Sequence, residues 1–347
     1  MRAASIAAAI LAAAVAASAG AAFIPKMPDF VRGADVSSIT EMEKRGDRVS
    51  SALGVEADGF RIMREFGVEA VRLDVLVNPS GDGWCAARDT LDKATRARMA
   101  GLQVMLAFHY SDVYATAERQ EIPGVWSNLD AAGLSRAVYM HTAQVLALMK
   151  RNHIVPLWVQ VGNAVNDGFL WPAARMSENP KVFADVFESG YKAVKAVFPK
   201  TAVLIHFDRG HDFGLFDRTL SLLRKHHVPW DVAACSVFPS KCREERPDAD
   251  KLLMDILDVL KKVGYDFNCD TMIAELGLEC SPETYTESRR RLTALLFEAS
   301  KVRRCRGVFY YEPMLRKGDA GNPLGAFDGR GFPTPIMEGF RPVYRNF

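Results

Sequence analysis

The chain has 347 residues, of which 49% are hydrophobic and 25% are charged, so it holds enough apolar material for one large core. Its 44 Lys and Arg residues nearly balance its 42 Asp and Glu residues, which leaves a formal net charge of +2. Binding nucleic acid mainly through charge requires a strongly basic face, and no run of Lys or Arg supplies one here. We therefore expect a globular protein that does not bind nucleic acid.

An alanine-rich apolar segment opens the chain over residues 3–22. It contains the small-residue pattern Ala17-Ser18-Ala19, which suits a signal peptidase. We predict a signal peptide over residues 1–22, a single domain over 23–347, and a secreted or periplasmic protein with no stable membrane insertion. The alternative is an uncleaved anchor, since the segment is nearly long enough to span a bilayer, although alanine makes it only weakly hydrophobic.

Six cysteines occur in this chain, and two alternatives stay open for them. An exported protein can form one or more disulfides, whereas buried free thiols are the simpler arrangement. The cysteine spacings match no zinc pattern, and His206 and His211 lack the i, i+4 helical spacing of a metal site. We therefore expect no metal ion and no cofactor. The cysteines are Cys85, Cys235, Cys242, Cys269, Cys280 and Cys305.

Eight short segments rich in β-forming residues recur along the chain, about 40 residues apart. They are almost continuously apolar, which is typical of parallel strands buried on both faces. The predicted strands are Gly33–Val36, Ala70–Val75, Gln103–Phe108, Pro156–Val161, Ala202–Phe207, Asp231–Val237, Thr271–Ala274 and Gly307–Tyr311.

Helical patterns lie between most of these strands. The clearest begins with Asn179 as N-cap and Pro180 at the first helical position, and it places Phe183, Phe187 and Tyr191 on one stripe. Glycine at 264 predicts the end of another helix. The other helical segments are Glu56–Phe66, Asp89–Ala100, Leu134–Lys150, Asp248–Val263 and Pro282–Lys301.

This alternation of strand and helix predicts an α/β protein, a single (β/α)8 TIM barrel. A doubly wound open sheet is the alternative. Such a sheet would usually carry a glycine-rich phosphate-binding turn after its first strand, and the sequence contains neither GxGxxG nor a Walker motif.

Polar and aromatic residues gather where the predicted strands end, which is where TIM-barrel enzymes hold their active sites. Carboxylates and amides meet sugar hydroxyls, and flat aromatic rings pack against pyranose faces, so this set suits a sugar polymer. Its members include Asp35, Arg72, His109, Asp112, Gln160, Asn163, His206, Asp208, Ser236, Glu275 and Tyr311, with Trp171 on a nearby loop.

Six motifs stand in a fixed order along the chain. They are Phe30–Ser37, Val71–Leu73, Phe108–Asp112, Gln160–Asn163, Leu170–Pro172 and Gly307–Pro313. In order and spacing these motifs resemble glycoside hydrolase family 53, the arabinogalactan endo-β-1,4-galactanases, and the resemblance extends from about Phe30 to the end of the chain.

The resemblance implies a monomeric, retaining hydrolase of β-1,4-galactan or arabinogalactan oligosaccharides. It implies an acid/base Glu after the fourth strand and a nucleophilic Glu that ends the seventh, with the two carboxyl groups about 5–5.5 Å apart. Glu275 matches the nucleophile motif. The residues implied to bind substrate are Asp35, Arg72, His109, Asp112, Asn163, Trp171, His206, Asp208 and Tyr311.

The acid/base position departs from the family. The family reads Gly-Asn-Glu where this chain reads Gly162-Asn163-Ala164. A methyl group carries no proton, and a positioned general acid typically contributes about 10²–10⁴-fold to the rate, so we expect slow galactan cleavage. Three other acids are candidates to replace the missing one: Asp167, Asp208 and Glu118.

Further departures surround the same site. Ala107, Tyr114 and Tyr311 replace an Asp and two Trp residues of the family pattern, and Phe238 replaces a Tyr that would donate to the nucleophile. The simpler alternatives are that Glu275 is an acid paired with Arg72, that His109 and Asp112 form a structural pair, and that Trp171 packs in the core.

Three functions follow from this reading. The first is an exported galactanase that is slow or uses a displaced acid. The second is a non-catalytic galactan-binding protein, which Ala164 and Phe238 favour. The third is hydrolysis of a different β-glycoside, which the changes at Tyr114 and Tyr311 favour.

Overall fold

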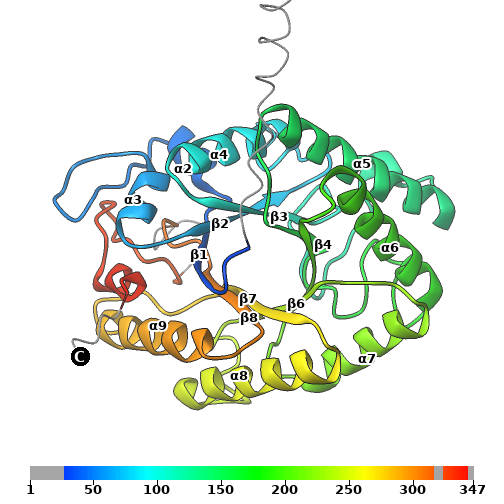
Figure 1. Cartoon of the computed structure of the whole chain (residues 1–347). Helices are drawn as coiled ribbons and strands as arrows, with labels where there is room; N and C mark the ends of the chain where they lie inside the picture. Colours follow the sequence, from blue (N-terminus) through cyan, green and yellow to red (C-terminus); the bar gives the residue numbers. More distant parts are fainter. Residues whose placement is uncertain (1–26, 316–322, 343–347) are drawn as a thin grey trace, which may run out of the picture.

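The computed structural model describes residues 27–315 and 323–342, and the predicted signal peptide at 1–22 lies outside them. Eight parallel strands form a closed barrel in chain order, and each strand pairs with the next. Figure 1 shows helices on the outside of this barrel. The predicted (β/α)8 TIM barrel is thereby confirmed, and the open sheet is excluded.

All eight predicted strands are present: three have the predicted bounds, and the other five differ by one or two residues at one or both ends. The strands are β1 (Val31–Asp35), β2 (Ala70–Val75), β3 (Gln103–Phe108), β4 (Trp158–Val161), β5 (Ala202–Phe207), β6 (Val232–Val237), β7 (Asp270–Leu276) and β8 (Cys305–Tyr310). The helices are α2 (Ile39–Lys44), α3 (Gly59–Glu65), α4 (Ala87–Met99), α5 (Ala131–Arg151), α6 (Pro180–Val197), α7 (Phe213–Lys225), α8 (Ala249–Asp266) and α9 (Tyr285–Ser300), with 3-10 turns η1 (Gly124–Trp126) and η2 (Pro335–Phe340).

Two helices correct the predictions from sequence. Helix α6 starts with Pro180 in its first turn as expected, but the side chain of Asn179 makes no capping hydrogen bond. Helix α8 does not end at Val263 and continues to Asp266. Gly264 therefore lies inside the helix, where an added Cβ would approach Arg304 and the carbonyl of Cys269 to within 3.1 and 3.3 Å. The glycine serves close packing there, and it does not terminate the helix.

Large and small residues alternate inside the barrel to fill it. Trp158 on β4 meets Phe309 on β8 edge to face, with ring centroids 6.2 Å apart. The ring of Phe309 occupies the space that a side chain on Gly33 of β1 would need. Small residues at Ala234 and Ala274 complete this inner cluster. The barrel is thus a packed core, and ligands are confined to its ends.

Two further predictions from sequence concern cysteines and membranes. The thiols of Cys85, Cys235, Cys269 and Cys305 are buried and free, which agrees with the second of the two alternatives for those four residues. Across residues 27–315 and 323–342, no helix is both long and apolar enough to cross a bilayer.

The contact between Gly33 and Phe309 makes a testable prediction. We expect Gly33→Ala to lower the free energy of unfolding by about 1–3 kcal/mol, because the new methyl group would overlap the Phe309 ring and force the packed barrel to shift. Urea unfolding followed by tryptophan fluorescence measures this change. Gly329→Ala is the matched control, since a Cβ there meets no atom within 4 Å. Equal stability of the two variants would contradict this account of the core.

Candidate active site

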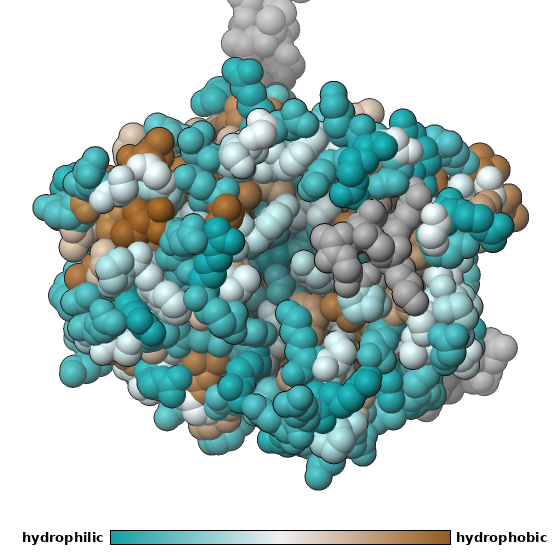
Figure 2. Space-filling view, turned by 180° about the vertical axis from the view of Figure 1, so that it is seen from behind, coloured by the Kyte–Doolittle hydropathy of each residue, from teal (hydrophilic) through white to brown (hydrophobic). Residues whose placement is uncertain are grey.

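The polar residues singled out in the sequence come together at the carboxyl ends of the strands. β1 ends at Asp35, β2 carries Arg72 and Asp74, and β7 carries Glu275 near its end. Figure 2 views the molecule from the side opposite to Figure 1 and shows a hollow at the barrel centre with hydrophilic residues in it. These side chains belong to different strands, so only the closed barrel brings them within contact distance.

The guanidinium of Arg72 is the hub of this cluster, and its side chain is fully buried. One terminal nitrogen, Nη1, contacts the carboxylate of Asp35 and lies 2.9 Å from Asp74 Oδ1. The other, Nη2, lies 3.0 Å from Glu275 Oε1 and donates to Asn163 Oδ1 at 3.0 Å. One cation thus links four strands or strand ends through three carboxylates and the amides of Asn163 and Gln160.

Burial and charge act in opposite directions on the groups around Arg72. Burial lowers the pKa of Arg72, but the charges of Asp74 and Glu275 outweigh this effect and raise it above its ordinary value. Burial alone would raise the pKa of Asp74, yet the charge of Arg72 and the contact with His109 hold it well below its usual range. For Asp35, burial and the charge of Asp74 outweigh the charge of Arg72, so the pKa of Asp35 is raised to about 6.

A hydrogen-bonded chain fixes the second oxygen of Glu275. Ser236 on β6 pairs in register with Glu275, and its hydroxyl donates to Glu275 Oε2 at 2.7 Å. The Oγ of Ser236 also lies 3.0 Å from His206 Nε2. On the other side of the ring, the backbone N–H of Ala164 donates to His206 Nδ1 at 3.1 Å. The chain therefore runs from Ala164 through His206 and Ser236 to Glu275.

This chain sets the protonation of His206. Because Nδ1 accepts from a backbone N–H, the ring proton must sit on Nε2, which donates to Ser236. Burial and the charge of Arg72 hold the pKa of His206 well below its usual value, so the ring is neutral. His206 has no exposed surface. His206 therefore positions Ser236 and the backbone of Ala164. Without exposed surface it does not make the direct sugar contact that the family resemblance implies.

Position 164 lies beside the same cluster. Its neighbour Asn163 contacts Arg72, and Gln120 Nε2 donates to the carbonyl groups of Asn163 and Ala164 at 2.7 and 3.1 Å. Gly162, Asn163 and Ala164 therefore adopt a fixed loop at the end of β4. The side chain at position 164 is a methyl group, which cannot donate or accept a proton.

Asp167, one of the candidate proton donors named from the sequence, is held by other groups. It lies three residues after Ala164, but its oxygens accept from Arg175 Nε at 2.8 Å and from the backbone and hydroxyl of Ser177 at 2.7 and 2.8 Å. Burial would raise the pKa of Asp167, but the hydrogen bonds from Arg175 and Ser177 lower it overall. A carboxylate held ionised in this way is a poor proton donor.

His109 and Asp112 do not form the pair that the sequence left as an alternative. Nε2 of His109 lies 3.1 Å from Asp74, and its Nδ1 accepts from the backbone N–H of Ala115 at 2.9 Å. Asp112 instead accepts from the backbone N–H groups of Asn78 and Gly124, at 2.9 and 2.8 Å. His109 thus belongs to the Arg72 cluster, and Asp112 holds two loops together.

Two aromatic residues flank the cluster. The guanidinium of Arg175 lies over the Trp171 ring, 4.6 Å from its centroid, and Trp171 Nε1 donates to the carbonyl of Asp167 at 2.9 Å. Trp171 is half-buried, so it is not simply a core residue. Tyr311 meets Phe238 edge to face with ring centroids 5.4 Å apart, and both side chains retain some exposed surface.

Asp74 was not singled out in the sequence, and Ser236 was placed at a strand end without a role. Asp74 follows Arg72 by two positions on β2, so strand geometry puts both side chains on one face, and this period was readable from the sequence. The role of Ser236 depends on its register with Glu275, which becomes known only when β6 and β7 are paired.

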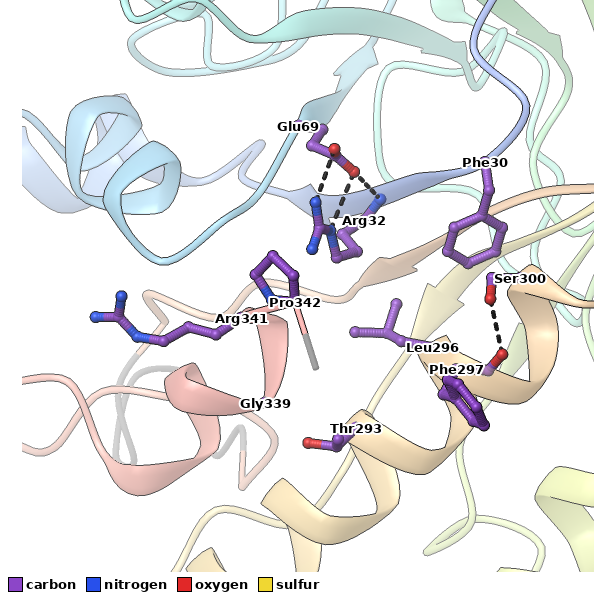
Figure 3. Close-up of a pocket in the computed structure, with 10 residues that line it drawn as sticks. All are labelled: Phe30, Arg32, Glu69, Thr293, Leu296, Phe297, Ser300, Gly339, Arg341 and Pro342. Atoms are coloured by element: carbon purple, nitrogen blue, oxygen red, sulfur yellow. Dashed lines mark hydrogen bonds and ion pairs between the residues drawn. The ribbon is translucent and has the colours of Figure 1, made fainter. Parts of the chain in front are cut away.

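A different hollow lies at the other end of the barrel and is shown in Figure 3. It has a volume of about 220 Å³, and apolar side chains such as Phe30 and Leu296 form much of its wall. Its charged residues are already paired, since Arg32 donates to Glu69 at 2.8 and 3.1 Å. Because this hollow borders the amino ends of the strands, we do not assign the chemistry to it.

Comparisons of the sequence with known proteins all point to one family. The model of glycosyl hydrolase family 53 matches residues 31–323. An arabinogalactan endo-beta-1,4-galactanase of Thermothelomyces thermophilus is 34% identical over 300 residues, which cover 81% of this chain and 89% of the relative. An endo-beta-1,4-galactanase of Bacillus subtilis is 30% identical over 262 residues, 74% of this chain and 58% of the relative.

A solved structure is similar over nearly the whole fold. The Ignisphaera aggregans GH53 catalytic domain superposes with a TM-score of 0.80 at 27% identity, covering 93% of this chain and 98% of that one. The chain spans between 54 and 59% of the length of the first three curated relatives that it matches.

The buried hub at Arg72 makes a stability prediction. We expect Arg72→Met to lower the free energy of unfolding by about 3–5 kcal/mol at pH 7, because it leaves buried carboxylates without their cation. The loss should shrink at pH 5, since Asp74 no longer has a depressed pKa and can take up a proton in the folded variant. Denaturant unfolding at both pH values measures this.

Arg119→Met is the control for this experiment, since Arg119 pairs with Glu121 at the exposed surface and such pairs contribute little. A loss for Arg72→Met no larger than that of the control would contradict the hub.

Proposed function

This chain belongs to glycosyl hydrolase family 53, and from that premise we propose that it is a retaining hydrolase of β-1,4-galactan in which Glu275 is the nucleophile and the usual acid/base carboxylate is absent at Ala164. The observation that carries the proposal is the double support of Glu275. One oxygen meets Arg72 at 3.0 Å, the other accepts from Ser236 at 2.7 Å, and 8% of the residue remains exposed.

These contacts suit a nucleophile. Ser236 and Arg72 together fix the plane of its oxygens. In a retaining reaction such a carboxylate attacks the anomeric carbon and forms a glycosyl-enzyme, which water then hydrolyses. The exposed part of Glu275 is what a nucleophile needs in order to meet a substrate.

The missing acid affects the leaving group. Without a proton donor the departing sugar leaves as an alkoxide, so the first step is slow for galactan and much faster for a substrate whose leaving group is already a stable anion. The same carboxylate would normally deprotonate the incoming water. Both steps of galactan hydrolysis are therefore slowed in this chain.

The choice of galactan rests on two kinds of support. The printed names of the relatives describe endo-β-1,4-galactanases, and the half-buried rings of Trp171 and Tyr311 flank the cluster as sugar-stacking surfaces would. The proposal includes export, which the apolar, alanine-rich start of the chain supports, and a monomeric state.

A second candidate function is a non-catalytic galactan-binding protein. Two observations favour it: Ala164 carries no proton, and Phe238 has no hydroxyl to donate to Glu275. Calorimetry with galactotetraose separates it from complete loss of function, because a binding protein releases heat at millimolar ligand and a decayed site does not.

The first prediction concerns Glu275. We expect the purified protein to release oligosaccharides from β-1,4-galactan slowly, and Glu275→Gln to lower that release at least 10³-fold, because the amide cannot form the glycosyl-enzyme. Chromatography of the products over long incubations measures both rates. If the wild type forms no more product than Glu275→Gln, the hydrolase proposal is ruled out and the non-catalytic galactan-binding protein remains as the candidate function.

The second prediction concerns position 164. We expect Ala164→Glu to raise galactan hydrolysis by up to about 10²–10⁴-fold, and by less to the extent that another acid already supplies the proton. Ala164→Gln has nearly the same shape but no acid and should give no increase. If Glu and Gln at this position behave alike, the space at residue 164 does not face the scissile bond.

A further inference from the structure

A hollow of about 240 Å³ lies between the loops that follow β5 and β6. Ser236, which donates to Glu275, lines it, as does Phe238. Asp208, the first residue after β5, also lines it and is half-buried. One residue of its wall, Ser236, therefore contacts the predicted nucleophile, and another, Asp208, carries a second carboxylic acid.

Asp208 is also tied to the loop that lost its carboxylate. Its backbone N–H donates to Asn166 Oδ1 at 2.9 Å, and Asn166 lies two residues after Ala164. Because β4 and β5 are neighbours in the barrel, the loop containing Ala164 and the start of the loop containing Asp208 lie side by side. The acid is therefore held near the vacant position by a defined contact.

The carboxyl group of Asp208 is not committed to a structural ion pair. Its Oδ1 accepts from the backbone N–H of Arg209 at 2.9 Å, and in the described part of the chain no cation lies within ion-pair distance of it. Most other acids around the cluster are committed: Asp35 and Asp74 contact Arg72, and Asp112 and Asp167 hold loops. In Glu312 one oxygen accepts from the backbone and hydroxyl of Ser38, while its Oε2 is enclosed and has no hydrogen-bond partner among the described residues.

We propose that Asp208 is the proton donor of this enzyme, acting from the end of β5 in place of the acid missing at Ala164. This inference rests on the proposed function, since it assigns the acid for the same reaction at the same site. It makes Asp208 a catalytic residue and not only the sugar contact that the family resemblance implies.

The electrostatic setting agrees with this assignment. Burial raises the pKa of Asp208, and the negative charge of Glu275 raises it further, whereas the N–H of Arg209 and the charge of Lys241 act against these effects without reversing them. A carboxylic acid that keeps its proton closer to neutral pH is what a general acid requires.

The reaction balances with these two residues. As Glu275 forms a bond to the anomeric carbon, the bond from that carbon to the glycosidic oxygen breaks and the proton of Asp208 moves to that oxygen. The Asp208 carboxylate then takes a proton from water, whose oxygen attacks the anomeric carbon and releases Glu275. The net change is the addition of one water across the glycosidic bond.

Glu118 is the rival acid in the same hollow. It is exposed, and it accepts from the hydroxyl of Thr116 at 3.0 Å, next to it in its own loop. It has no hydrogen bond to the loop of Ala164 among the contacts of the described residues. These observations favour Asp208, and the experiment includes Glu118→Gln as the competing variant.

The experiment compares Asp208→Asn with wild type on galactan and on 2,4-dinitrophenyl β-galactobioside, whose leaving group needs no proton. We expect kcat/KM on galactan to fall at least 10²-fold and kcat/KM on the aryl substrate to change less than about 3-fold. Sodium azide, which attacks the glycosyl-enzyme without base assistance, should raise kcat of the variant on the aryl substrate. Asp217→Asn, an exposed acid on α7, is the matched control and should alter neither activity.

Testing Asp208→Asn in the Ala164→Glu variant as well as in the wild type separates proton donation from sugar binding. If Asp208 donates the proton, Ala164→Glu should restore galactan hydrolysis to the Asp208→Asn variant, bringing it within about 10-fold of Ala164→Glu alone. A residue that only binds sugar would cost the same factor in both backgrounds, and that result would overturn the proposal. Circular dichroism melting of every variant identifies any that fail to fold.

The remaining outcomes are also decisive. Equal galactan activity of Asp208→Asn and wild type, or a loss confined to Glu118→Gln, overturns the role of Asp208. If the wild type cleaves the aryl substrate but not galactan, the role of Asp208 is also overturned. The proposal that Glu275 is the nucleophile then still stands. If the wild type cleaves neither substrate, the proposed hydrolase itself fails, and the Asp208 proposal fails with it.

Discussion

The contact of Arg72 with three carboxylates is the interaction on which the active end of this barrel depends. A buried guanidinium requires nearby negative charge, and Asp35, Asp74 and Glu275 supply it from three strands. The same contacts that neutralise the cation therefore fix the orientation of Glu275. The Arg72 guanidinium thus stabilises the fold and also orients the proposed nucleophile, so a substitution at Arg72 should affect both stability and activity.

This arrangement explains how position 164 supports the site without an acidic side chain. Position 164 contributes its backbone N–H to His206, and through Ser236 that bond supports Glu275. The backbone bond does not depend on which side chain stands at position 164. The nucleophile and its supports persist, while the proton donor must come from elsewhere. Asp208 borders the same hollow and is not held in an ion pair by the described residues.

The sequence predicted the barrel well because buried parallel strands are continuous apolar runs, and such runs are visible without any structure. Helix α7 was missed, although its buried stripe of Phe216, Leu220 and Leu223 has ordinary helical spacing. Contacts between strands were harder to predict. That His109 meets Asp74 and not Asp112, and that Asp208 shares a hollow with Ser236, depends on how separate loops fold against each other.

The central claim is that Glu275 is a working nucleophile in a site whose position 164 provides no acid. The most direct measurement is mass spectrometry of the protein after incubation with 2,4-dinitrophenyl 2-deoxy-2-fluoro-β-galactobioside, which reacts without acid help and forms a slowly hydrolysed glycosyl-enzyme. The account predicts one covalent fluorogalactobiosyl group on the peptide containing Glu275. An unlabelled protein, or a label on any other residue, would contradict it.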